Sequence, residues 1–147
     1  MLNTQPQFFG SQPQEKIITE LVDKCSSLCR DSKCSAAVVT EGGVDCTGFD
    51  AVCAPCGLEI SGAKKLLTYS EGDINADLCA LNVQHKESYV CFELMSAQHM
   101  GRVFVSNGLE ITVGSVLVAA AVLCACGAPL EKVIEKFNSF LKKEQQI

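Results

Sequence analysis

An Asn107-Gly108 pair, flanked on both sides by runs rich in β-branched residues, is the feature that most restricts the fold of this chain. The runs cover residues 102–106 before the pair and 109–113 after it. Asn-Gly favours a two-residue turn because both residues accept a positive φ angle, and the flanking residues favour strands. The pattern therefore predicts a β-hairpin.

The residues after this hairpin predict one more strand and a final helix. The run 113–124 is almost wholly apolar and rich in alanine, so a buried helix is one possibility. We favour a central strand buried on both faces, because Val116, Val118 and Val122 are β-branched. Pro129 then stands at a plausible first helical position. The apolar face of the final helix would hold Leu130, Val133, Ile134, Phe137 and Leu141.

The rest of the chain predicts a helix, a hairpin, a short helix and two strands. Ser11 and Gln14 resemble a capping box at the start of the first helix. Residues 1–12 predict a flexible N-terminal extension, which leaves one domain over 13–147. We expect an α+β domain, with a central antiparallel sheet and the N- and C-terminal helices packed together on one face. The remaining predicted elements are the hairpin strands 36–40 and 44–49, the short helix 62–69, and the strands 78–83 and 89–94.

The composition excludes several classes of function. The chain has 147 residues, of which 48% are hydrophobic and 20% charged, as is usual for one compact domain. Its longest apolar stretch is too short to cross a bilayer, and the N-terminus lacks a secretory pattern, so we expect a cytoplasmic protein without membrane insertion. A net charge of −5 argues against a nucleic-acid partner. The ten cysteines are expected to be reduced thiols.

The order of elements resembles that of profilins, small proteins that bind actin monomers. Ser35-Ala36-Ala37-Val38-Val39 stands where a profilin has a short Ala-Ala-Ile-Val strand. Ile111-Thr112-Val113 echoes a Val-Thr-Val pattern that precedes an apolar strand. Two weaker matches are 60–64, at the start of the next profilin helix, and 88–92, in its middle strand.

The resemblance implies a monomeric, cytoplasmic, cytoskeletal protein that regulates actin assembly, with no enzymatic activity and no cofactor. It also implies a site for proline-rich partners at Leu21, Lys24 and Phe140. Profilins use tryptophans there, and this chain has none, so we expect weak or lost polyproline binding, or the use of Phe8 and Phe9 instead. The implied actin-binding positions are Ser88, Val90, Phe92, Arg102, Gly127, Glu131 and Glu135.

Two other functions stay open. Cys53-Ala54-Pro55-Cys56 has the Cys-x-x-Cys spacing of thiol-disulfide oxidoreductases, although the strand before it is weak. The same pair, with Cys124 and Cys126, offers four thiolates for zinc, but the second pair is more typical of core, and we expect no metal. A roadblock-type dimerising scaffold has a similar order of elements but needs a longer helix after the first hairpin.

Overall fold

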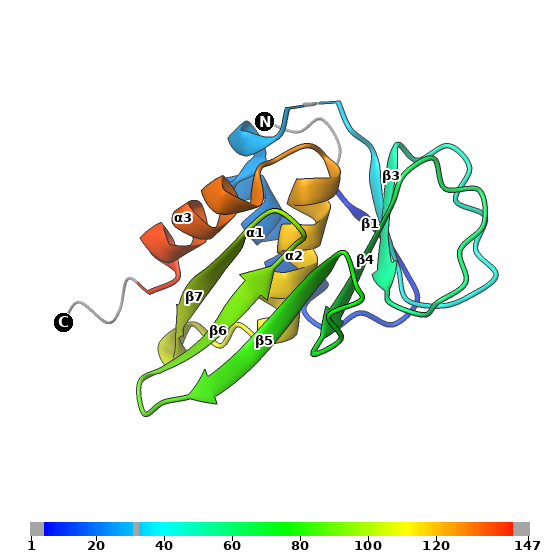
Figure 1. The fold of residues 1–147 in the computed structure, drawn as a ribbon. Coiled ribbons are helices and arrows are strands. Elements are labelled where there is room, and N and C mark those ends of the chain that lie inside the picture. Colours follow the sequence, from blue (N-terminus) through cyan, green and yellow to red (C-terminus); the bar gives the residue numbers. More distant parts are fainter. Residues whose placement is uncertain (1–4, 31–32, 143–147) are drawn as a thin grey trace.

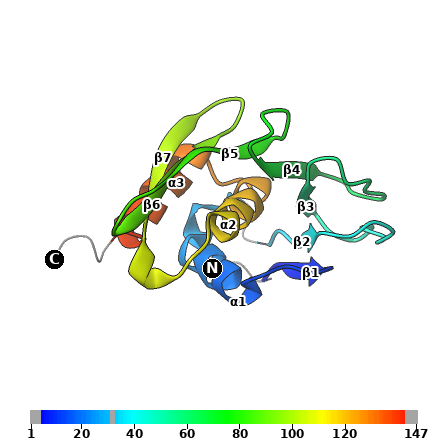
Figure 2. The ribbon, with the colours of Figure 1, turned by 90° about the horizontal axis from the view of Figure 1, so that it is seen from below.

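A curved sheet wraps around one central helix (Figures 1 and 2). The computed structural model describes residues 5–30 and 33–142, and within them the chain forms seven strands and three α-helices. The helices are α1 (Glu15–Lys24), α2 (Val113–Ala125) and α3 (Leu130–Phe140). The strands are β1 (Gln7–Phe9), β2 (Ala36–Val39), β3 (Ala51–Pro55), β4 (Leu66–Glu71), β5 (Leu78–His85), β6 (Tyr89–Met95) and β7 (Met100–Ser106).

The strands lie side by side in the order in which they occur along the chain. Every neighbouring pair from β1 to β5 is parallel, whereas β5–β6 and β6–β7 are antiparallel. The prediction of one sheet with helices is confirmed, but the sheet is mixed and mostly parallel, and a profilin-like arrangement is not confirmed. Parallel strands are usually joined by helices, but no α-helix lies between β2 and β5. The short connections in the sequence therefore predicted antiparallel hairpins.

The predicted hairpin at Asn107-Gly108 is wrong. Residues 107–109 form a short 3₁₀ helix, and of the residues in this segment only Glu110 has a positive φ angle. The amide of Asn107 instead donates hydrogen bonds to the carbonyls of Lys86 and Glu87, in the turn between β5 and β6. The pair therefore fixes the end of β7 to that neighbouring turn.

The run predicted as a central strand is the helix α2. Its side chains are apolar on all sides, which is the composition of a helix surrounded by core. Alanine and leucine favour a helix more strongly than the four valines oppose it, and a run of 13 residues has the length of a helix. Throughout residues 5–30 and 33–142, no helix is long and apolar enough to span a membrane.

Two side chains cap the start of α2. The hydroxyl of Thr112 accepts a hydrogen bond from the Ser115 amide N–H over 3.1 Å. The side-chain oxygen of Gln14 accepts from the Thr112 amide N–H over 3.2 Å and from the hydroxyl of the buried Ser115. Gln14 immediately precedes α1 and has a left-handed backbone conformation (φ 60°). Its side chain nevertheless caps a different helix, α2. The predicted capping box at Ser11 and Gln14 thus has another role.

Several smaller predictions are settled by the same structure. The strands at 78–83 and 89–94 are confirmed as β5 and β6, and the final helix as α3. The predicted short helix 62–69 is wrong, because β4 occupies its second half and its first half is not helical. The flexible extension 1–12 stays a prediction: residues 1–4 lie outside the described residues, and Gln7–Phe9 pairs with β2 as strand β1.

All three helices lie within the concave side of the sheet (Figure 2), where α2 contacts strands from β2 to β5. The terminal helices also approach each other, since the Lys24 ammonium of α1 lies 4.9 Å from the Phe140 ring centroid of α3. On the convex side, the loops 40–50 and 56–65 cover a smaller apolar cluster. This second cluster consists of Ala37, Val39, Cys46 and Val52, with partly buried residues such as Phe9 and Phe49 around it.

Helix α3 protects the free edge of the sheet. Asn138 accepts a hydrogen bond from the Phe104 amide N–H over 3.0 Å and donates one to the Arg102 carbonyl over 2.8 Å. Both backbone groups belong to β7, the last strand. Unpaired edge strands can pair with strands of other molecules, so this contact blocks such pairing at the edge formed by β7.

The buried ring of Phe137 should contribute strongly to stability. It is fully buried between α3 and the core, so Phe137→Ala should lower the free energy of unfolding by about 3–5 kcal/mol. Urea unfolding followed by circular dichroism measures the loss. Phe140→Ala, one turn later and only partly buried, is the control and should cost less. Equal losses in the two variants would contradict the described packing.

Loss of the Gln14 acceptor should weaken the start of α2. Gln14→Met keeps the size of the side chain but leaves the buried Ser115 hydroxyl without this acceptor, which should cost about 1–3 kcal/mol. The matched control is Gln12→Met, because the Gln12 side-chain amide donates a hydrogen bond to the carbonyl of its neighbour Pro13 and not to α2. Urea midpoints that fall equally in both variants would rule out the proposed cap.

Candidate ligand-binding site

A cavity of about 860 Å³ opens where the parallel strands end and α2 begins. Its lining comes from the ends of β3, β4 and β5, the start of β6, and the first turns of α2. Ligands in α/β proteins usually bind at the carboxyl ends of parallel strands, and pockets of this volume hold small organic molecules. The position and size of the cavity make it the leading candidate for a functional site.

The floor of the cavity is apolar. Tyr69 of β4 and Leu117 of α2 are buried in the same hydrophobic core that lies beneath the cavity. Burial raises the pKa of Tyr69 to about 12, so its hydroxyl is neutral at physiological pH. A buried neutral surface of this kind favours an uncharged, apolar part of a ligand.

The rim of the cavity is polar and acidic. Glu71, at the end of β4, approaches the first turn of α2: a Cβ atom added to Gly114 would lie 3.3 Å from its carboxylate oxygen. Negative charge is favourable there because of the helix dipole. Glu110, His85 and the Cys56 thiol also line the cavity, and the described lining residues include no lysine or arginine.

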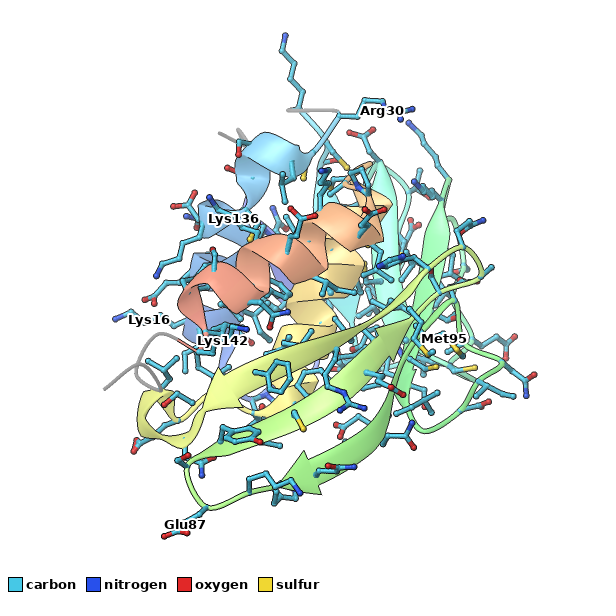
Figure 3. The ribbon with its side chains drawn as sticks, turned by 60° about the vertical axis from the view of Figure 1, so that its left-hand side comes forward. Lys16, Arg30, Glu87, Met95, Lys136 and Lys142 are labelled. Atoms are coloured by element: carbon cyan, nitrogen blue, oxygen red, sulfur yellow. The ribbon has the colours of Figure 1, made fainter. Side chains whose placement is uncertain are left out.

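A second cavity of about 920 Å³ lies at the opposite end of α2. It is lined by the starts of β4 and β5, the turn after Met95 and the start of α3. Figure 3 shows how far apart the two ends of β6 are, with Glu87 in the turn before the strand and Met95 at its end. The second cavity faces the amino ends of the parallel strands, where α/β proteins less often bind ligands.

The residues expected to contact actin do not share one surface. Val90 and Phe92 of β6 are buried in the core, and Arg102 of β7 pairs with Glu93 over 3.3 Å. Gly127 follows α2 with a φ angle of 96°, which favours glycine, and a Cβ atom added there would lie 2.9 Å from the Cβ of Arg30. The remaining three positions are exposed: Ser88 in the turn between β5 and β6, and Glu131 and Glu135 on α3.

The positions expected to bind polyproline are partly brought together. Lys24 and Phe140 form the cation–π contact between α1 and α3 described above. Leu21 is instead buried in the core, so it offers no surface to a proline-rich segment. Phe8 and Phe9, the alternative aromatic pair, belong to β1 and are partly buried.

The Cys53-x-x-Cys56 motif does not resemble a redox site. Cys53 lies within β3 and is fully buried, and desolvation raises its pKa, whereas a thiol-disulfide oxidoreductase needs a cysteine with a lowered pKa. No helix follows the motif, since the next regular element is β4. Among the described residues, no group of three or more His, Cys, Asp or Glu side chains is arranged to hold a metal ion.

Few features of the sequence indicate the cavity. Glu71 and Glu110 were not expected to be functional, because they lie in segments without any recognised motif. The available signal was Thr112-x-x-Ser115, which is typical of a helix start. Assigning 113–124 to a strand hid that signal.

No protein-family model matches this sequence, and neither does any curated protein sequence. Among solved structures, a UDP-N-acetylmuramoyl-L-alanyl-D-glutamate–2,6-diaminopimelate ligase is similar over 71% of this chain, with a TM-score of 0.54 and 14% identity. A UDP-N-acetylmuramoylalanyl-D-glutamyl-2,6-diaminopimelate–D-alanyl-D-alanyl ligase from Acinetobacter baumannii is similar over 70% of the chain, with a TM-score of 0.49 and 14% identity. This chain covers 28% of the length of each ligase.

These likenesses correct the profilin resemblance. The structures that this chain resembles are ligases, and its sheet is mostly parallel, so the assignment to the profilin family is wrong. Actin as a partner, regulation of actin assembly and a cytoskeletal role rested on that assignment and are wrong with it. The expectation of a protein without enzymatic activity rested on the same assignment and is contradicted with it. Neither the oxidoreductase nor the roadblock alternative is supported, since residues 56–69, where a roadblock helix would lie, form no helix and end in β4. At this identity the likeness establishes a shared fold.

Proposed function

We propose that this chain is a ligand-binding domain of a ligase-type enzyme, and that its ligand is a small molecule with an apolar body and an amino group. The observation that carries the proposal is the 860 Å³ cavity at the carboxyl ends of β3, β4 and β5. The apolar body would rest on the floor near Tyr69 and Leu117, and the amino group would face the acidic rim.

The charges on the rim select the amino group. The start of a helix commonly attracts an anion, but here the carboxylate of Glu71 already lies against the first turn of α2. A phosphate or carboxylate ligand would face Glu71 and Glu110 without any lysine or arginine among the described lining residues to balance its charge. A protonated amine would donate charge-assisted hydrogen bonds to the same two carboxylates.

The ligase context rests on the fold. The likeness with a TM-score of 0.54 concerns a ligase whose name includes a diamino acid, which agrees with an amino-bearing ligand but does not identify it. Because this chain corresponds to 28% of that ligase's length, the proposal concerns ligand binding and not the complete ligation reaction. A cytoplasmic location is part of the proposal, because seven of the ten cysteines are buried as small apolar side chains, which is typical of reduced thiols.

Three six-carbon probes of matched length test the chemistry of the cavity. Hexylamine should shift the methyl NMR signals of Val90, Leu117 and Val118, which line the cavity. Hexanol should bind more weakly because it lacks the positive charge, and hexanoate should not bind, because its carboxylate meets two others. Tighter binding of hexanoate than of hexylamine would contradict the proposal.

Variants of the rim separate binding at this cavity from binding elsewhere. Glu71→Gln and Glu110→Gln should each weaken hexylamine binding roughly tenfold, because a neutral amide loses the charge-assisted contact. Glu59→Gln is the control, since Glu59 is exposed and does not line the cavity. If all three variants bind hexylamine like the original chain, the amine does not contact this rim.

A further inference from the structure

Two cysteines that are distant in sequence meet in the core. Cys34 lies just before β2, and Cys126 follows the last residue of α2. Their sulfur atoms are 2.6 Å apart, which is shorter than an ordinary contact between two thiols and approaches the roughly 2.05 Å of a covalent disulfide. Both residues are almost fully buried, with exposed fractions of 3% and 2%.

The surroundings of the pair are rich in sulfur. Burial, the hydrogen bond to Cys34 and the nearby thiols Cys29 and Cys53 all raise the pKa of Cys126. Cys124, in the last turn of α2, is close enough to Cys53 to help raise the pKa of the Cys53 thiol. Of these five residues, Cys29 and Cys124 are partly exposed.

From this geometry we propose that Cys34 and Cys126 are a site of oxidative modification, at which a peroxide converts the two thiols into a disulfide. One thiol first gives its electron pair to a peroxide oxygen and becomes a sulfenic acid, while the other oxygen leaves as water. The second thiol then attacks that sulfur, the S–S bond forms, and a second water leaves. In sum, two thiols and one hydrogen peroxide give one disulfide and two waters, so electrons and protons balance.

The disulfide would join parts of the fold that only non-covalent contacts hold together. The two residues are separated by 92 positions, so the bond would close a long loop and restrict the unfolded chain strongly. It would fix the start of β2 to the turn between α2 and α3, where Gly127 packs against Arg30. Figure 3 shows Arg30 at this end of the molecule. The inference does not depend on the ligand proposed above.

Stoichiometric hydrogen peroxide applied to the full chain tests the proposal. The expected product is a monomer that has lost two hydrogen atoms and two titratable thiols, and its unfolding temperature should rise by roughly 5–15 °C. Dithiothreitol should reverse both changes. A product with sulfinic acid or with intermolecular bonds instead would overturn the proposal, as would purification of the chain with a thiol-bound metal ion.

Substitutions identify the pair, because tryptic fragments alone do not. The fragment after Lys33 contains Cys34, Cys46, Cys53 and Cys56, and the fragment after Arg102 contains Cys124 and Cys126. Cys34→Ala and Cys126→Ala should each abolish the cross-link between these fragments and the rise in unfolding temperature. Cys53→Ala and Cys124→Ala should retain both. Circular dichroism of the reduced variants confirms that each is folded before oxidation.

The matched control is Cys91→Ala, because Cys91 is equally buried but lies on β6, away from the pair. This variant should oxidise like the original chain. Retention of the cross-link in Cys34→Ala or Cys126→Ala would assign the disulfide to another pair and refute the inference.

Discussion

The burial of α2 on all sides is the constraint on which the rest of the structure depends. Ten of its 13 residues are buried, and the sheet curves around it from β2 to β5 (Figure 2). A helix without a polar face is stable in water only when other elements cover it completely. The sheet supplies one side of that cover, and α1 and α3 supply the rest.

The position of the candidate site follows from the direction of α2. The helix begins at the edge of the sheet where β3, β4 and β5 end, so its first turn and three strand ends converge on one cavity. The caps from Thr112 and Gln14 fix that first turn. Glu71 approaches the same turn, and the negative charge there is what favours an amine over an anion. Fold and ligand chemistry are thus linked through a single helix terminus.

The other end of α2 carries the second chemically distinctive feature. The Schellman-type turn, in which the Ala128 amide N–H donates to the Leu123 carbonyl over 2.9 Å, brings Cys126 against the start of β2. The cysteine pair and the ligand cavity therefore lie at opposite ends of α2. The structure separates the two proposals in space, and each can be tested without the other.

Part of this account could be predicted from the sequence. The apolar runs of β5 and β6 around a polar turn and the helical spacing of α3 are local patterns, and these three elements are predicted correctly. The parallel pairing of β1 to β5 depends on long-range contacts between strands joined by irregular loops, which no local pattern encodes. The Asn107-Gly108 pair predicted a hairpin because β-branched residues flank it on both sides. The second run forms no strand, because it leads directly into α2. The cavity could not be predicted, because its rim is assembled from segments that meet only after folding.

Backbone chemical shifts of residues 113–125 test the central claim most directly. If α2 is the helix around which the sheet folds, Cα shifts through this segment should be consistently helical, and amide hydrogen exchange from Val116 to Leu123 should be as slow as global unfolding. Strand-like shifts, or rapid exchange at these amides in the folded protein, would contradict the account. The cavity at the start of the helix would then not exist in the form described.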